Sequence, residues 1–315
     1  MKIYPLLFAI LSTPALAVDK INLQTVRIDN LNNPADSTGY GSVPYGYSIG
    51  STEVSNLEYT AFLNSADPNG TNPNGIYSSS MGSDAVNGGI TFTSGATAGS
   101  KYTSKLGFAN KPVSYVNFLD AMRFANWLNS DQNGSATESG AYLLSAGGLA
   151  VRNLAATVFV TSENEWYKAA YYDPTTGAGG GDNYWRYPTQ SDSTPGASTP
   201  NGLANQANYN SVVNAVTIGA AYSSSSSYYG TFDQGGNLYE WNDAVIGSGR
   251  GLRGGAYNFG PNPMLATSRN SNNPFVESVD TGFRITTIPE PSALLSLLLS
   301  TPLLLARRPR SQVLG

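Results

Sequence analysis

The sequence predicts a single domain in which a few short helices are held among long, irregular loops. Its 315 residues include 34 Gly and 18 Pro, only 12% are charged, and Ser, Asn and Thr form long runs. This composition is typical of a loop-rich extracellular domain with a polar but uncharged surface. Apolar residues make up 40% of the chain, which is enough for a substantial core. Because the chain has no cysteine, packing must stabilise it, alone or with a bound metal ion.

The first 17 residues are typical of a secretory signal peptide. Lys2 is followed by an apolar stretch over residues 6–11 and then by Ala15-Leu16-Ala17, a small-residue cleavage site. We therefore expect the mature chain to begin near Val18, with one domain over residues 18–287. The alternative is a buried N-terminal strand.

Three segments are predicted to form helices because each opens with a side-chain cap and an acid three residues later. In such a capping box, the two side chains satisfy backbone donors that the helix leaves unpaired. The pairs are Ser55 with Glu58, Asn117 with Asp120, and Ser162 with Glu165. The second helix also has one apolar face at helical spacing, formed by Phe118, Ala121, Met122, Ala125 and Leu128. We expect the aromatic and Met side chains of these helices to lie in the core.

Long polar stretches separate the helices, over residues 67–104, 130–148 and 173–205. Loops of this length without regular structure are uncommon, and are usually functional or locally disordered. The five serines at 223–227 are predicted to form a flexible loop tip. Tyr228 and the Asn-rich segment 268–274 are either contact residues for a ligand or solvated loop surface.

The C-terminal segment combines a short motif, an apolar run and a basic cluster. These are Pro289-Glu290-Pro291, the run 293–305, and Arg307, Arg308 and Arg310. As a helix the run reaches about 20 Å, short of the ~30 Å hydrocarbon core, so we expect transient membrane insertion rather than a lasting anchor. The basic cluster favours a cytoplasmic C-terminus.

This order resembles the PEP-CTERM sorting signals of Gram-negative bacteria, which an exosortase recognises and removes. The resemblance implies that residues 288–315 are such a signal. It also implies export to the cell envelope, the outer surface or the extracellular matrix. The alternative is a plain tail anchor.

Six ordered motifs between Glu53 and Ile285 resemble the formylglycine-generating enzyme, or sulfatase-modifying factor, family. They are EVSNLEYTAFLN, KPVSYVNFLDAMRFANWLN, SENEWYKAAYY, GTFDQGGNLYEW, RGLRGGAY and GFRI. The resemblance implies an α+β, C-type-lectin-like fold with little regular secondary structure. It also places Arg253 and Arg284 in packed C-terminal motifs, where we expect structural roles.

The resemblance does not extend to the known chemistry of the family. Its oxidases use two cysteines that bind copper and the substrate thiol, and the matching positions here are Phe259 and Met264. Its sulfoxide synthases bind iron through histidines, and the chain has none. We therefore expect no catalytic residues and no copper, iron or zinc. The carboxylates that remain as acid/base candidates for a cysteine-independent enzyme are Asp233, Glu240, Asp243 and Glu163, while Glu165 is better explained as a helix cap.

The resemblance does imply a structural calcium ion in the loop FDQGGNLYEW. Its ligands would be the side chains of Asp233 and Glu240 and the carbonyls of Gly236 and Leu238. Calcium favours such hard oxygen ligands on flexible loops. A weaker second site would begin at Asn208 and Tyr209 but lacks its downstream acid. The alternative is a loop that serves only as scaffold.

These observations favour a non-catalytic binding or structural module at the cell surface or in the matrix, with an enzyme of unknown activity as the alternative. A net charge of −4 offers no basic surface for nucleic acid. Exopolysaccharide or a surface protein is the expected partner, besides the exosortase.

Overall fold

The computed structural model describes residues 20–145, 150–175 and 181–288. The predicted signal peptide at 1–17 and the segment with Pro289, Glu290 and Pro291 lie outside these residues. No helix in the described ranges is both long and apolar enough to cross a membrane.

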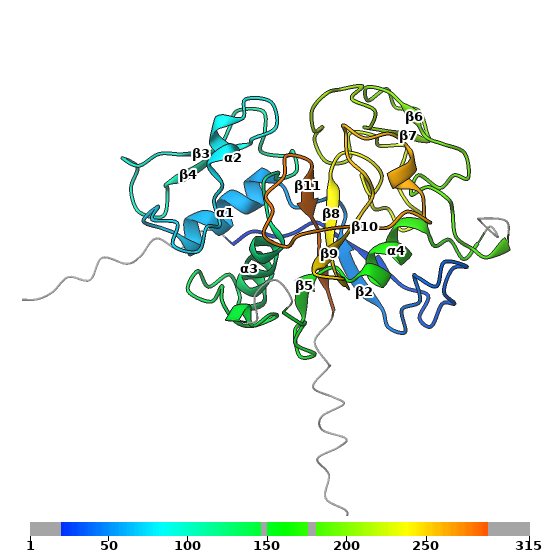
Figure 1. Ribbon diagram of the computed structural model, residues 1–315, viewed down its shortest axis with the longest axis horizontal. Coiled ribbons are helices and arrows are strands. Elements are labelled where there is room, and N and C mark those ends of the chain that lie inside the picture. The colour runs from blue at the N-terminus through cyan, green and yellow to red at the C-terminus, as the bar shows by residue number, and fades with distance from the viewer. Residues whose placement is uncertain (1–19, 146–149, 176–180, 289–315) are drawn as a thin grey trace, which may run out of the picture.

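The described chain consists of short helices and strands joined by long loops, with most of the strands after Tyr171 (Figure 1). The helices are α1 (Asn56–Ala66), α2 (Ser79–Ser83), α3 (Phe118–Asn129) and α4 (Glu163–Tyr171), with a 3-10 turn, η2 (Asn262–Met264). The strands are β1 (Thr25–Ile28), β2 (Tyr47–Gly50), β3 (Ile90–Phe92), β4 (Tyr102–Ser104), β5 (Val158–Val160), β6 (Gly196–Ala197), β7 (Gln206–Ala207), β8 (Tyr239–Ile246), β9 (Gly249–Arg253), β10 (Asn270–Asn272), β11 (Thr281–Phe283) and β12 (Ile285–Thr287).

Two four-stranded sheets form the centre of the fold. One has the antiparallel order β1-β2-β12-β5, and the other has the order β10-β9-β8-β11, in which only β8 and β11 run parallel. Arg284 alone separates β11 from β12. The GFRI motif therefore connects the two sheets.

The three predicted helices and their caps are confirmed. Complete capping boxes open α1 at Ser55, α3 at Asn117 and α4 at Ser162. Of the predicted apolar face of α3, Leu128 is half-buried and the other four side chains are fully buried. Sequence-local capping thus fixed where each helix begins.

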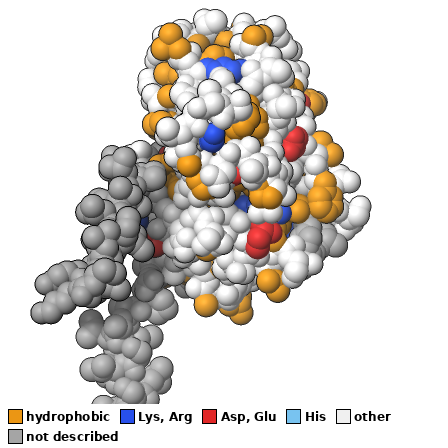
Figure 2. Space-filling view, turned by 90° about the vertical axis from the view of Figure 1, so that its left-hand side faces the viewer, with side chains coloured by type: hydrophobic (Ala, Val, Ile, Leu, Met, Phe, Trp, Pro, Cys, Tyr) orange, Lys and Arg blue, Asp and Glu red, His pale blue; other side chains and the backbone are white. Residues whose placement is uncertain are grey.

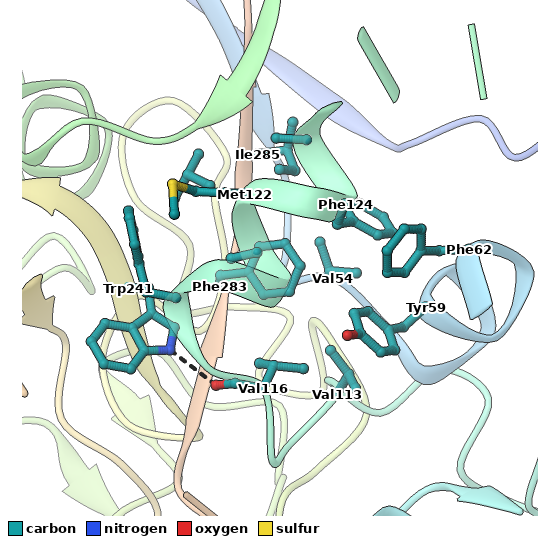
Figure 3. Packing of buried hydrophobic residues seen from close by; sticks show 14 of the residues in the cluster. Val54, Tyr59, Phe62, Val113, Val116, Met122, Phe124, Trp241, Phe283 and Ile285 are labelled. Atoms are coloured by element: carbon teal, nitrogen blue, oxygen red, sulfur yellow. Dashed lines mark hydrogen bonds between the residues drawn. The ribbon is translucent and has the colours of Figure 1, made fainter. Parts of the chain in front are cut away.

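The main core lies where α1 and α3 pack against the sheets (Figure 3). Rings from α1, α3 and β11 pack together, with Phe124 edge-on to both Phe62 and Phe283. Trp241 on β8 donates its indole N–H to the Val116 carbonyl at 3.0 Å. This bond satisfies the polar atom of a fully buried ring.

Two expectations about loops were wrong. Residues 67–104 contain α2 and the β3–β4 hairpin, because Tyr77, Phe92 and Tyr102 form an aromatic cluster there. The serine run 223–227 is not simply an exposed tip: Ser225 and Ser227 are buried and make side-chain hydrogen bonds. The surface visible in Figure 2 carries few charged side chains, in line with the composition.

Candidate functional site in the C-terminal loops

The segment FDQGGNLYEW forms a tight loop that leads into β8. Asp233 and Asn237 have left-handed φ angles of 59° and 60°, which Asp and Asn adopt more readily than most residues. Gly236 also has a positive φ of 80°, and a Cβ there would lie 2.3 Å from the Asn208 backbone oxygen. The Asn237 N–H donates to that same oxygen at 2.8 Å. The loop is therefore fixed against the segment that begins the second predicted calcium site.

Glu240, at the end of this loop, forms a buried ion pair with Arg284. Arg284 Nε donates to Glu240 Oε2 at 2.5 Å, and Nη2 donates to Oε1 at 2.6 Å. The indole N–H of Trp166 also donates to Oε2, at 2.7 Å. The guanidinium further donates to the carbonyls of Gly50 and Phe232, at 2.8 and 3.0 Å. Arg284 thus joins both sheets to the loop, which agrees with the structural role expected for it.

Two further carboxyl groups lie near this ion pair. Burial raises the pKa of Glu53 well above its usual range, and the nearby charges of Asp233 and Glu240 raise it further. Burial also raises the pKa of Asp233 to about 6. Glu53 Oε1 accepts from Asn237 Nδ2 at 3.2 Å, whereas its Oε2 is buried without a hydrogen-bond partner. Three acids therefore face one arginine, and the raised pKa values mean that protonation of Glu53 and Asp233 relieves part of their repulsion.

The side chains assigned to calcium retain some capacity to accept a ligand. A carboxylate has about four lone-pair sites. Arg284 and Trp166 occupy three of those on Glu240, which leaves one on Oε1. Asp233 accepts one hydrogen bond in the described structure, from Ala220 N to Oδ2 at 2.7 Å. These lone pairs leave room for a calcium ion that takes a single oxygen from Glu240, but the described residues contain no group of three or more Asp, Glu, His or Cys side chains placed to hold a metal ion.

At the second predicted site, Asn208 Oδ1 is buried without a hydrogen-bond partner. Its amide nitrogen donates to the Ala215 carbonyl and to Asn237 Oδ1, at 2.8 and 3.2 Å. The Tyr209 carbonyl accepts from Val212 N at 3.3 Å. An unpaired buried oxygen of this kind suits a water molecule or a hard cation.

The two positions assigned to thiols lie in different surroundings. Met264 is fully buried in a small cluster with Tyr187 and Tyr209. Phe259 is 39% exposed, and its ring lies edge-on to Tyr239 with centroids 5.1 Å apart. A core thioether and a surface ring thus stand where a soft copper site would need thiolates.

Polar groups lie on the residues next to Phe259 and Tyr239. Asn258 Nδ2 donates to Asp280 Oδ2 at 3.3 Å, and the Phe259 carbonyl accepts from Asn210 N at 2.6 Å. Ser278 Oγ donates to the other Asp280 oxygen at 2.6 Å. The exposed ring, the amide of the preceding residue Asn258 and the carboxylate of Asp280, whose carbonyl accepts from the N–H of Tyr239 at 2.9 Å, form one group of residues. We call this the Phe259 surface.

Comparison with known proteins identifies the family. The family model described as "Sulfatase-modifying factor enzyme 1-like domain" matches residues 36–287. The chain belongs to this family.

Solved structures confirm the predicted α+β, C-type-lectin-like fold with little regular structure. CarF superposes with a TM-score of 0.54 at 20% identity, over 85% of this chain and 99% of CarF. Variable protein 1 of Treponema denticola superposes with a TM-score of 0.51 at 19% identity, over 87% of this chain and 98% of that one. No curated protein matched.

In this sulfatase-modifying factor domain, Arg253 has a structural environment that the sequence only partly revealed. Its guanidinium lies 4.9 Å from the ring centres of both Tyr40 and Tyr167. Glu163 pairs with Arg253 Nη2 and with Arg269 Nη2, each at 2.7 Å. Glu163, a candidate acid from the sequence, therefore has both oxygens in ion pairs. No sequence signal marked Arg269 or Tyr40 as its neighbours.

Four cavities were compared in the part of the chain that the structure describes. The remaining candidate acid, Asp243, lines none of these four. Burial raises its pKa to about 7, and the nearby Glu165 adds to the shift. Asp233 lines a cavity of about 10 Å³, which is room for one water molecule. Arg253, Phe259 and Met264 line none of the four either. The described geometry therefore favours no particular acid/base pair.

Proposed function

We propose that this family member is an exported, non-catalytic module that binds saccharide through the Phe259 surface. The observation that carries the proposal is the exposed Phe259 ring, held edge-on against Tyr239 at the position assigned to a thiol. A rigid ring offers contact area at little cost in conformational entropy. The C–H face of a sugar packs on such a ring, whose π face is electron-rich.

The neighbouring polar groups support a saccharide over an apolar ligand. Asn258 directly precedes Phe259, and its exposed amide bonds the carboxylate of Asp280 at 3.3 Å. These groups can donate to and accept from sugar hydroxyls. A matrix exopolysaccharide would supply many such rings along one chain, so weak individual contacts would combine into avid binding.

Titration of the purified protein with exopolysaccharide fragments tests this proposal. We expect saturable binding without product formation, and loss of binding in Phe259→Ala. Phe275→Ala is the matched control, because Phe275 is a phenylalanine 60% exposed that lies outside the Phe259 surface as defined here. Equal binding by wild type and Phe259→Ala would refute the role of the ring, and turnover of the fragments would favour the enzyme alternative.

Export and tail removal are part of the same proposal. The signal peptide at 1–17 and the motif Pro289-Glu290-Pro291 support it. Intact-mass measurement on protein from the native host should give a chain that starts near Val18 and lacks the Arg cluster. Recovery of residues 292–315 on the surface protein would contradict exosortase processing but not export.

We also propose that calcium stabilises the loop at 232–241. The side chains of Asp233 and Glu240 and the carbonyls of Gly236 and Leu238 would hold it. The ion would neutralise part of the acidic cluster and stiffen a domain that has no disulfides. The lone pairs that remain free on Asp233 and on Glu240 Oε1 support this role.

A further inference from the structure

We infer that one end of the domain rests on a lipid bilayer while the C-terminal segment is inserted. This end comprises Leu143, Val151, Leu154 and Ile288, and we call it the membrane-facing end. The inference rests on the proposed insertion of the apolar run 293–305. It adds that the folded domain itself contacts lipid.

The spacing between the fold and the apolar run limits how far the domain can stand from the membrane. Ile288 is held in the fold by a hydrogen bond from its N–H to the Thr157 carbonyl at 2.9 Å. Residues 289–292 separate Ile288 from the first residue of the run, Ala293. Fully extended, the chain from Ile288 to Ala293 spans at most about 17 Å. The end of the domain that carries Ile288 must therefore lie close to the bilayer surface.

The length of the run brings the domain closer still. A helix over 293–305 reaches about 20 Å, whereas the hydrocarbon core is ~30 Å thick. Arg307 and Arg308 follow directly and favour the cytoplasmic surface. A span about 10 Å too short is accommodated by drawing both flanks toward the bilayer or by thinning it. On the other side of the bilayer, the flank that is drawn toward the membrane is the folded domain.

Exposed apolar side chains on the segments of Leu154 and Leu143 are suited to lipid contact. Leu154 is 93% exposed, Val151 is 82% exposed and Leu143 is 61% exposed. The Asn153 N–H donates to the Ala141 carbonyl at 2.8 Å, which brings the segment of Val151 and Leu154 beside that of Leu143.

A cavity connects this cluster to the exit of the chain. Leu154 and Ile288 both line an open hollow of about 170 Å³, together with Arg152 and Phe159. The Arg152 guanidinium covers the Phe159 ring at 3.9 Å and pairs with Glu165 at 3.3 Å. Its charge is thus already balanced, while the Leu154 side chain beside it is 93% exposed. Apolar side chains at a membrane interface gain stability by entering the headgroup boundary.

The absence of cysteine from the natural chain allows a direct test. Leu154→Cys, labelled with an environment-sensitive fluorophore, would be reconstituted as the full chain in phosphatidylethanolamine/phosphatidylglycerol vesicles containing spin-labelled lipid. Ser300→Cys, within the apolar run, reports insertion. Leu203→Cys is the matched control, because Leu203 is an exposed leucine in the segment between β6 and β7. These two strands lie far from β5, which pairs with β12 close to the point where the described chain ends (Figure 1).

We expect the label at Leu154 to shift to the blue and to lose most of its emission through quenching by lipid, and the label at Leu203 to remain unchanged. Quenching at Ser300 without quenching at Leu154 would overturn the inference while leaving insertion intact. Equal quenching at Leu154 and Leu203 would also overturn it, because it would indicate non-specific adsorption. Absence of quenching at Ser300 would refute the proposed insertion and the inference together.

Discussion

Replacement of Arg284 by Ala tests whether the buried ion pair with Glu240 holds the two sheets together. Removing one partner of a buried pair typically costs 3–5 kcal/mol, since the other charge is left buried and uncompensated. The carbonyls of Gly50 and Phe232 would also lose a donor, and an unsatisfied buried acceptor costs about 1–3 kcal/mol. Because such terms are not additive, we expect a loss of about 5 kcal/mol, a large part of the 5–15 kcal/mol typical of a domain.

Urea unfolding followed by tryptophan fluorescence measures this loss, since Trp166 contacts Glu240 directly. The control is Arg27→Ala. Arg27 pairs with Asp29 at 2.9 Å on the surface, so the expected cost is below about 1 kcal/mol. If Arg284→Ala proves too unstable to purify, Glu240→Gln in combination with Arg284→Met should recover part of the stability, since that variant buries no uncompensated charge. A cost for Arg284→Ala no larger than that for Arg27→Ala would refute the reasoning.

Three further predictions concern the metal, pH and chemistry. Chelation of calcium should lower the melting temperature of the wild type but not that of Asp233→Asn, a variant that leaves the Arg284 pair intact. At a hundredfold excess over Kd the ion contributes about 2.7 kcal/mol to the free energy of unfolding. An equal shift in the variant would mean that the ion binds elsewhere. Burial raises the pKa of Asp243 to about 7 and that of Asp120 to about 8. Between pH 5 and 8 the folded state therefore holds protons that the unfolded chain has already released. The free energy of unfolding should fall as pH rises through this range. Because the chain has no histidine, denaturant titrations in this window report mainly on buried carboxyl groups, and Asp243→Asn should flatten the dependence; a rise in stability with pH would contradict the assignment. Finally, the purified protein should not convert a cysteine-containing sulfatase peptide to formylglycine, with or without copper, because Phe259 and Met264 supply no thiolate. Copper-dependent conversion detected by mass spectrometry would overturn this expectation.

The features that could be predicted from sequence are those in which neighbouring residues act on one another. The box of Asn117 and Asp120 fixed the start of α3, and apolar spacing fixed its buried face. The β3–β4 hairpin was missed because each strand has only three residues, and the contact between the Phe92 and Tyr102 rings that accompanies their pairing is not visible in the sequence. The burial of Ser227 was also missed. Its hydroxyl bonds that of Thr231, within a serine run that the sequence predicts to be an exposed loop tip.

At the candidate site, the sequence predicted which residues take part but not which of them pair with one another. Motif order identified Glu240 and Arg284, but their pairing joins positions 44 residues apart and depends on the parallel register of β8 and β11. Glu53 gave no sequence signal as a member of the acidic cluster, because it precedes a helix cap and its partner Asn237 lies 184 residues away. Long-range charge pairing of this kind follows from topology, which composition and spacing do not encode.

The separation between these contacts and the thiol positions explains how the fold can persist without the family chemistry. The side chains of Glu240, Arg284 and Trp166 bond one another and the backbone of both sheets, and none of these bonds involves Phe259 or Met264. Met264 instead adds apolar contacts to a small satellite cluster, and Phe259 packs on Tyr239 at the surface. Substitution at the two thiol positions therefore leaves the ion pair intact and exposes an aromatic ring.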